Sequence, residues 1–236
     1  PFSGSLARTA VADEFETPME TLFADFDDQA VAAASIAQVH FAVTTDGRDV
    51  AVKVLRPGIE AAFARDLDLF FWVAGLIERT RPEWRRLKPL ESVATLAETV
   101  KMEMDLRFEA AAASELAENF AGDDTFQVPR VDWTLTGRRV LTTDRARGIP
   151  LDDRRAIIAA GLDPLAVIEK AAGVFFKQVF RDGFFHADLH SGNLFVGEDG
   201  NIVAVDFGIM GRLDRRARRH IGEMLLAFLN RDYRRA

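Results

Sequence analysis

The chain has no cysteine among its 236 residues. Disulfides, thiolate metal sites and cysteine nucleophiles are therefore excluded, and the composition suits a reducing compartment. Lysine is also scarce, with five in the whole chain, so a lysine inside an apolar strand is conspicuous. Any catalysis must use carboxylates, amides, imidazoles, hydroxyls or these few amines.

Long hydrophobic runs are missing as well. The longest, residues 69–77, has about half the length that a bilayer-spanning helix needs, and no signal-peptide pattern opens the chain. We therefore expect the chain as given to be soluble. With 48% apolar residues it can bury a sizeable core, as one large domain or as two lobes.

An excess of positive charge is absent, since the formal net charge is −7. Nucleic-acid binding is therefore not expected, because phosphate backbones are held mainly by surplus Lys and Arg. Arginines nevertheless gather near the end of the chain. This run is either a solvated helix face or a contact with an anionic membrane surface. It comprises Arg212, Arg215, Arg216, Arg218, Arg219, Arg231, Arg234 and Arg235.

The run from His186 to Asn193 carries the strongest chemical signal. It matches the kinase catalytic-loop pattern H-R-D-L-x-x-x-N at every fixed position except the Arg, and Asp206-Phe-Gly follows thirteen residues after Asn193. Phosphoryl transfer needs a carboxylate to orient the attacking group, and an amide and a second carboxylate to hold divalent metal. We predict Asp188 as the catalytic carboxylate and Asn193 and Asp206 as ligands of Mg²⁺.

The segment between these motifs predicts a β-hairpin. Residues 194–196 and 202–205 are short apolar strands, and the polar turn 197–201 joins them. Such a hairpin returns Asp206 beside Asn193, as a shared metal site requires. Either motif alone is weak evidence, whereas both in this order, with strands between them, indicate a nucleotide site.

A second nucleotide signal lies in the first quarter of the chain. Residues 41–43, a turn at 44–48 and the apolar run 49–55 predict a hairpin, and Val50-Ala-Val-Lys53 matches the V-A-I-K pattern. The lysine of that pattern pairs with the α and β phosphates of ATP. Lys53 is therefore predicted to bind nucleotide, as ATP or ADP, and to take part in catalysis.

Residues 31–39 have high helix propensity, but their place before this hairpin predicts a phosphate loop. Aligned on G-x-G-x-x-G-x-V, every glycine is replaced by alanine. Because alanine disfavours positive φ, we predict a stiffer loop of altered shape. The predicted nucleotide-contacting residues here are Ala32, Ala33, Ala34, Ser35, Ala37, Val39 and Ala51.

Helical patterns fill much of the remainder. Residues 6–15 and 18–23 predict short helices; residues 59–79 predict a long one, with Leu67, Phe70, Phe71 and Ala74 as core. Residues 90–120 predict one very long helix. A kinase needs one helix carboxylate to position the strand lysine. The pattern alone does not choose among the acids Glu98, Glu103, Asp105 and Glu109.

The middle of the chain predicts a junction between lobes. Residues 128–135 and 138–143 predict a hairpin, and residues 144–150, beginning at Asp144, an irregular hinge whose backbone reads adenine. Residues 164–182 then predict an amphipathic helix with one apolar core face. That face comprises Leu165, Ile168, Ala172, Phe175, Phe176 and Val179. We thus predict an α+β fold with a small, mostly antiparallel lobe at 1–146 and a mainly helical lobe at 147–236.

Several segments together resemble the UbiB family of atypical, kinase-like proteins of ubiquinone biosynthesis. They are Ala33-Ala-Ser-Ile-Ala-Gln-Val-His40, Val50-Ala-Val-Lys-Val-Leu-Arg-Pro57, Glu103-Met-Asp105 with Arg107 and Glu109-Ala-Ala111, Gln178-Val-Phe-Arg-Asp-Gly-Phe-Phe-His-Ala-Asp-Leu-His190 and Phe228-Leu-Asn-Arg-Asp-Tyr-Arg234. The resemblance implies a two-lobed kinase-like fold and an ATPase or unorthodox kinase activity. It also implies that Glu103 pairs with Lys53, with Asp105 as the second acid of the Glu-x-Asp motif.

The same resemblance implies partners: a quinone-like or isoprenoid lipid, a membrane surface and other ubiquinone-biosynthesis proteins. It places the full-length bacterial protein on the cytoplasmic side of the inner membrane. Two family features, an upstream Lys-x-Gly-Gln motif and downstream membrane helices, are not among these residues, and Ser191 replaces the usual Pro.

Other functions stay open. After Gly208, residues 209–213 lead directly to a predicted helix, with no Ala-Pro-Glu segment, so phosphorylation of proteins is not expected. A small-molecule kinase of the aminoglycoside or choline type shares the His-x-Asp-Leu-His-x-x-Asn pattern. A nucleotide-gated lipid-binding module would use the same residues without turnover.

Overall fold

The computed structural model describes residues 1–232, apart from the side chain of residue 82. Arg234 and Arg235 of the arginine run lie outside these residues. The chain forms two compact units. Unit 1 comprises residues 1–108 and 131–145, and unit 2 comprises residues 109–130 and 146–236. The α+β class is confirmed, and residues 109–130, placed by sequence in the first lobe, group with unit 2.

An antiparallel sheet organises unit 1. Its order is β1-β3-β4-β6, with β2 paired to β3. The strands are β1 (Phe23–Phe26), β2 (Ala32–Ala33), β3 (Ala37–Thr44), β4 (Asp49–Leu55) and β6 (Val140–Asp144). Side chains alternate along β4, so Val50, Val52 and Val54 enter the core, while Ala51 and Lys53 lie on the opposite face.

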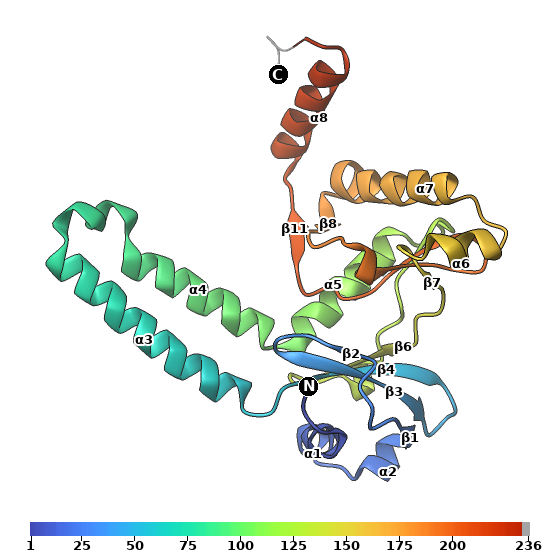
Figure 1. The fold of residues 1–236 in the computed structure, drawn as a ribbon, viewed down its shortest axis with the longest axis horizontal. Helices are drawn as coiled ribbons and strands as arrows, with labels where there is room; N and C mark the ends of the chain where they lie inside the picture. The colour runs from blue at the N-terminus through green and yellow to red at the C-terminus, as the bar shows by residue number, and fades with distance from the viewer. Residues whose placement is uncertain (233–236) are drawn as a thin grey trace. The chain divides into compact units, whose positions relative to one another are not determined.

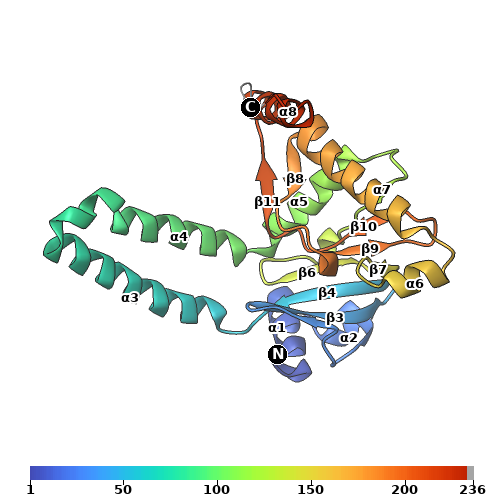
Figure 2. The ribbon, with the colours of Figure 1, turned by 45° about the horizontal axis from the view of Figure 1, so that its top comes forward.

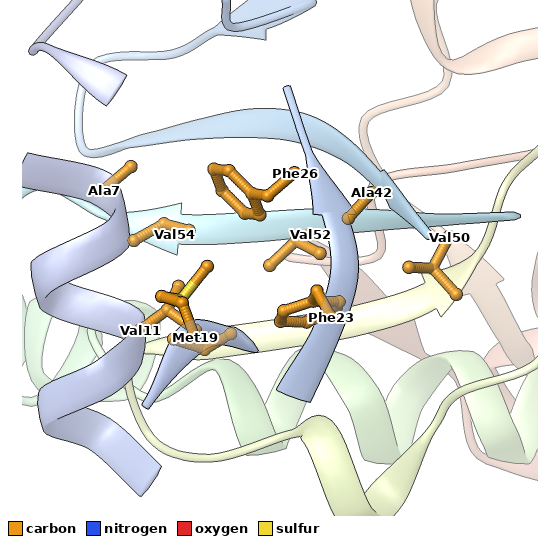
Figure 3. Packing of buried hydrophobic residues seen from close by; sticks show 10 residues of the cluster. Ala7, Val11, Met19, Phe23, Phe26, Ala42, Val50, Val52 and Val54 are labelled. Carbon is orange, nitrogen blue, oxygen red and sulfur yellow. The ribbon is translucent and has the colours of Figure 1, made fainter. Parts of the chain in front are cut away.

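Two helices cover the core face of this sheet: α1 (Gly4–Phe15) and α2 (Met19–Leu22). They confirm the short helices predicted at residues 6–15 and 18–23. Ala7 and Val11 of α1 are completely buried. Figure 3 shows these side chains and the rings of Phe23 and Phe26 against the valines of β4. This apolar layer fixes β4, and therefore fixes which residues of β4 remain on the other face.

A buried polar network ties the first residues of the chain to β3. The Nδ1 atom of His40 is 2.8 Å from the Asp27 carbonyl oxygen, so it donates there and leaves Nε2 as an acceptor for the Gln38 amide. The Gln38 side chain also donates to the Phe2 carbonyl and accepts from the Phe2 amide. Every polar side-chain atom of Gln38 and His40 is therefore hydrogen-bonded, as the nearly complete burial of both residues requires.

A helical hairpin follows β4. It consists of α3 (Ile59–Thr80), the 3₁₀ turn η1 (Pro82–Leu87) and α4 (Pro89–Glu103), and Figures 1 and 2 show it extending from the sheet of unit 1. The prediction that Leu67, Phe70, Phe71 and Ala74 form core is wrong except for Ala74, the one buried residue of α3. The helix packs mainly on α4 and on η1, and most of its apolar side chains stay outside the core.

The single helix predicted at residues 90–120 is also wrong. It breaks after α4, and α5 (Leu106–Asn119) begins two residues after Met104. The Asp105 carboxylate accepts the backbone N–H of Arg107 at 3.1 Å, as a helix-capping residue does. The Arg107 side chain binds the same carboxylate twice, which holds the pKa of Asp105 below its usual value. A local cap thus overrides continuous helix propensity.

The predicted hairpin at residues 128–143 contains one strand rather than two. Val131 makes only an isolated bridge to Thr143, and residues Trp133–Leu135 form the 3₁₀ turn η2. The Asp132 carboxylate accepts the amides of Thr134 and Leu135, and so stabilises the turn. The irregular connector predicted at residues 144–150 is confirmed only for residues 145–148, because Asp144 ends β6 (Val140–Asp144) and Ile149–Pro150 form β7.

Unit 2 contains a four-stranded sheet of order β5-β10-β9-β7 and a separate two-stranded sheet of β8 and β11. Its strands are β5 (Phe126–Gln127), β7 (Ile149–Pro150), β8 (Phe184–His186), β9 (Leu194–Val196), β10 (Ile202–Ala204) and β11 (Met210–Arg212). Beyond the α5 residues, its helices are α6 (Arg154–Ala159), α7 (Pro164–Phe176), the π-helix η3 (Lys177–Asp182), the 3₁₀ turn η4 (Ser191–Asn193) and α8 (Arg215–Leu229).

The helix predicted at residues 164–182 is present, but of its predicted core face only Val179 is buried. Leu165, Ile168 and Phe176 are exposed, whereas Val167 and Val174 are buried. After Phe176 the helix widens into π geometry. The mismatched residues all precede this turn, so the difference lies within α7 itself, because helical periodicity defines a face but not the element that covers it.

Among residues 1–232, no helix combines the length and hydrophobicity needed to cross a bilayer.

Candidate active site

A glycine connects the π-helix to the catalytic loop. Gly183 has φ +68°, and a Cβ there would lie 2.5 Å from the Leu213 carbonyl oxygen, so no other residue fits without strain. The chain then enters β8, which pairs with β11 so that His186 lies opposite Met210. The segments that follow His186 and precede Met210 therefore lie side by side.

His186 holds this loop together from a buried position. Its backbone N–H donates to the buried Gln178 side chain at 3.0 Å, and its Nε2 is 3.4 Å from the Val205 carbonyl oxygen. With Nε2 donating, Nδ1 is free to accept the Asp188 amide, at 3.2 Å. The ring also packs against Phe207. The backbone of Asp188 is thus fixed, while the residue itself stays exposed.

The predicted return of the chain from Asn193 to Asp206 is confirmed. In the β9–β10 hairpin Leu194 pairs with Ala204, and the Val205 amide donates to the Asn193 carbonyl at 2.9 Å. Asn193 is buried, and its side-chain nitrogen donates to the Asp188 carbonyl at 3.3 Å. Asp206 is exposed at φ +63°. One hydrogen-bonded segment therefore sets the backbone around all three catalytic candidates.

This donor set fits a hard divalent cation. The Asn193 nitrogen is used in a hydrogen bond, so its amide oxygen is the atom suited to a metal, and Asp206 supplies a carboxylate. Mg²⁺ favours oxygen ligands and usually keeps water or phosphate oxygens in its shell. Within residues 1–232 no group of three or more His, Cys, Asp or Glu side chains could hold a metal ion. Asn193 and Asp206 would supply two protein ligands, and phosphate oxygens or water the others.

Glu109 is a candidate that sequence reasoning did not select. It is 7% exposed on α5, whereas Glu103 is exposed at the end of α4. A Cβ placed on Gly208 would lie 3.5 Å from the Asp206 Oδ1 and 3.9 Å from the Glu109 Oε2, so both carboxylates flank Gly208. The sequence contains a signal for this acid, because Glu109 interrupts an apolar stripe at helical spacing. The stripe consists of Leu106, Ala110, Ala113 and Leu116, all buried.

In unit 1, strand register places several of the predicted nucleotide residues on one face. Lys53 lies opposite Val39 on β3 and opposite Leu141 on β6, and Val39 lies opposite Ala32 on β2. Directly paired residues of antiparallel strands point to the same side. Ala51 is two residues from Lys53 on β4 and shares this face, opposite the helical core.

The alanine loop forms a tight turn. The Ala34 amide donates to the Ala37 carbonyl at 2.8 Å, with Ser35 and Ile36 at the tip. In the described part of the chain, the non-glycine residues with positive φ are Glu16, Lys88, Asp206 and Arg231, none of them in this loop. The loop therefore needs no glycine conformation, in keeping with its alanines.

Three predicted site residues lie elsewhere. Ala33 is opposite Gln38, which is opposite the core residue Val54, so Ala33 is on the core face of the sheet. Asp144 pairs in register with Val50, which places it on the core face rather than beside Lys53, and its carboxylate is 3.7 Å from Arg48. Asp105 is bound by Arg107. Lys53 belongs to unit 1, while Asp188, Asn193, Asp206 and Glu109 belong to unit 2.

Comparisons with known proteins identify the family and the fold. The model of the ABC1 atypical kinase-like domain matches residues 1–236. A protein of Marinobacter nauticus described as "Probable protein kinase UbiB" is 43% identical over 99% of this chain, and one of Xylella fastidiosa with the same description is 42% identical over 100%. This chain spans 44% of each of these relatives.

A solved structure shares the fold. The structure of Rv3197 with erythromycin, from Mycobacterium tuberculosis, superposes with a TM-score of 0.79 at 27% identity, covering 99% of this chain and 58% of that one. The kinase-like fold and the UbiB resemblance predicted from sequence are thus confirmed. The chain belongs to the ABC1 atypical kinase-like family.

Proposed function

We propose that this chain is the nucleotide-binding and catalytic part of an atypical kinase-like ATPase that supports ubiquinone synthesis. The observation that carries the proposal is the hydrogen-bonded segment around His186, Asn193 and Val205, which fixes the backbone at Asp188 and Asp206. Such preorganisation is the main protein contribution to phosphoryl transfer.

The proposed roles follow from the chemistry of each side chain. Lys53 pairs with the α and β phosphates of ATP or ADP, and Asp188 orients water or an acceptor hydroxyl and takes its proton. Asn193 and Asp206 would hold Mg²⁺, which neutralises phosphate charge when bound. We assign the positioning carboxylate of the proposed nucleotide site to Glu109 rather than to Glu103, because a buried acid has reason to be retained only for a specific partner.

The test compares two aspartates of one hairpin. Asp206→Asn removes the proposed metal carboxylate, and Asp199→Asn makes the same change in the exposed turn between β9 and β10. We expect Asp206→Asn to weaken Mg²⁺-dependent nucleotide binding, measured by calorimetry, at least tenfold, since even indirect changes at metal sites cost 10- to 100-fold. Asp199→Asn should bind like the parent. Equal binding by both variants would remove Asp206 from the metal site.

Product analysis separates the ATPase from a small-molecule kinase, and complementation separates it from a lipid-binding module. An ATPase releases inorganic phosphate, with stimulation by a lipid or a phenolic quinone-head analogue and no phosphorylated product. A small-molecule kinase yields a phosphorylated amine or alcohol. A lipid-binding module without turnover predicts that Asp206→Asn, although unable to bind Mg-nucleotide, still restores quinone synthesis in a deficient strain.

A further inference from the structure

The end of the α3–α4 hairpin combines concentrated positive charge with exposed apolar side chains. Residues 79–88 contain five cations and one acid, in a chain whose net charge is −7. Trp84 and Leu87 lie within this segment and are 51% and 60% exposed. The cations are Arg79, Arg81, Arg85, Arg86 and Lys88, all exposed.

Contacts with neighbouring residues do not neutralise the surplus positive charge of residues 79–88. Arg81 is 3.9 Å from Glu83, and Lys88 is 2.7 Å from Glu91, so two of the cations have acidic neighbours. The Arg85 Nε donates to the Glu78 carbonyl at 2.8 Å and thereby fixes the turn. The positive end is thus a shaped surface and not an unstructured tail.

An apolar stripe on α3 leads towards this end. Leu69, Trp72, Val73 and Leu76 follow helical spacing and are all exposed, with Trp72 at 66%. No charged residue interrupts the chain between positions 69 and 77. An apolar helix face bordered by cations and an exposed Trp is the composition of elements that bind in the headgroup region of membranes.

We propose that residues 79–88 form a docking site for an anionic membrane surface, with Trp84 and Leu87 entering the interface and Arg81, Arg85 and Arg86 contacting lipid phosphates. Charge complementarity selects this occupant, since each Arg or Lys near an anionic leaflet contributes measurably to binding. The site lies in unit 1 and requires no nucleotide turnover.

The arginine run near the chain end is less suited to this role. Arg212 binds Glu115 at 2.8 Å, Arg219 binds Glu223 at 2.9 Å, and Arg218 donates to the Arg181 carbonyl. These arginines serve contacts within unit 2. The membrane contact considered for them from sequence is therefore assigned to the hairpin end instead.

The experiment uses the full chain and extruded vesicles of phosphatidylcholine, alone or with phosphatidylglycerol. Arg85→Glu/Arg86→Glu reverses two tip charges, and Arg215→Glu/Arg216→Glu makes the matched change at an exposed adjacent pair on α8. We expect the tip variant to lose at least tenfold in partitioning to anionic vesicles in flotation assays, and the α8 variant to bind within twofold of the parent. Binding of the parent should weaken with added salt.

A second measurement locates the contact and does not depend on the charge variants. With Trp72→Phe and Trp133→Phe, Trp84 is the sole tryptophan. Its emission should shift to shorter wavelength with anionic vesicles and be quenched by brominated acyl chains. Circular dichroism verifies folding, and Arg86→Glu alone serves if the double variant is perturbed.

Three results would overturn the proposal. The first is equal binding to neutral and anionic vesicles, and the second is loss of binding in the α8 variant but not in the tip variant. The third is a stable dimer in sedimentation velocity that Leu69→Ser/Trp72→Ser dissociates, together with vesicle binding indifferent to Arg85 and Arg86. That result would assign the apolar stripe to a second copy of the chain.

Discussion

Glu103 and Glu109 are six positions apart in the sequence, and their exposure to solvent differs. Glu103 is in contact with solvent, whereas Glu109 lies in the buried stripe of α5 near Gly208. An exposed carboxylate is already solvated, so its loss changes little. A buried one is retained against the cost of desolvation, which points to a defined cationic partner or ligand.

This contrast predicts different kinetics for two isosteric variants. Glu109→Gln should reduce phosphate release at least tenfold, because it removes the charge of the carboxylate proposed to position the nucleotide site. Glu103→Gln should remain within twofold. The measurement is steady-state ADP formation, with thermal unfolding to verify that both variants are folded. The reverse order of effects would restore the role that the UbiB resemblance gives to Glu103.

Motif-bearing residues were predictable because their chemistry dictates their types and spacing. Asp188, Asn193 and Asp206 came from fixed patterns, and short-range strand pairing then returned Asp206 to Asn193. Glu109 was not selected because the choice among acids depends on which helix face is buried. Asp144 pairs with Val50, whereas its neighbour Thr143 pairs with Ala51 on the face of Lys53. A shift of one residue along a strand moves a side chain to the other face of the sheet, and the sequence does not give this register.

At the scale of elements, the break between α4 and α5 rests on Asp105. Its carboxylate accepts the Arg107 amide at 3.1 Å and also binds the Arg107 guanidinium. The prediction of a continuous helix at residues 90–120 was wrong because helix propensity is summed over many residues. A single capping side chain can nevertheless decide where a new helix begins. Packing failed to match the apolar pattern in α3 and α7 for a related reason, since periodicity defines a face but not its partner.

Two substitutions separate the cap from the ion pair. Asp105→Ala removes both and should lower the free energy of unfolding by about 1–2 kcal/mol, the usual cost of a lost cap. Asp105→Asn keeps an oxygen that accepts the amide and should cost less, because the Arg107 side chain is largely exposed. Urea unfolding measures both. Loss of ATPase activity in Asp105→Asn at unchanged stability would show that this carboxylate also serves the nucleotide site.

At the scale of the whole molecule, the unfolding of the two units can be followed by different spectroscopic signals. All three tryptophans, Trp72, Trp84 and Trp133, belong to unit 1, and none belongs to unit 2. Tryptophan emission therefore follows unit 1 alone, while far-ultraviolet circular dichroism follows the helices of both. Comparing the two signals shows whether the units unfold together or separately.

An ion pair in unit 2 gives this comparison a pH dependence. Lys177 donates to the Asp123 carboxylate at 2.7 Å and, with Thr125, lowers the pKa of Asp123 to about 2. A carboxylate whose pKa is depressed on folding stabilises the native state above its unfolded pKa of about 4. That contribution disappears as the pH falls from about 4 towards 2. Since Lys177 is partly exposed, it amounts to on the order of 1 kcal/mol.

Asp123→Asn should abolish this dependence, and Asp124→Asn, an identical change at the exposed neighbouring residue, should retain it. In urea titrations at pH 6 and pH 3, followed by circular dichroism, the parent and Asp124→Asn should lose more stability on acidification than Asp123→Asn. If the units unfold separately, the tryptophan transition of unit 1 should not distinguish the variants. An Asp123→Asn variant as acid-sensitive as the parent would show that other carboxylates govern acid unfolding of unit 2, whereas a matching change in the tryptophan transition would show that both units unfold as one.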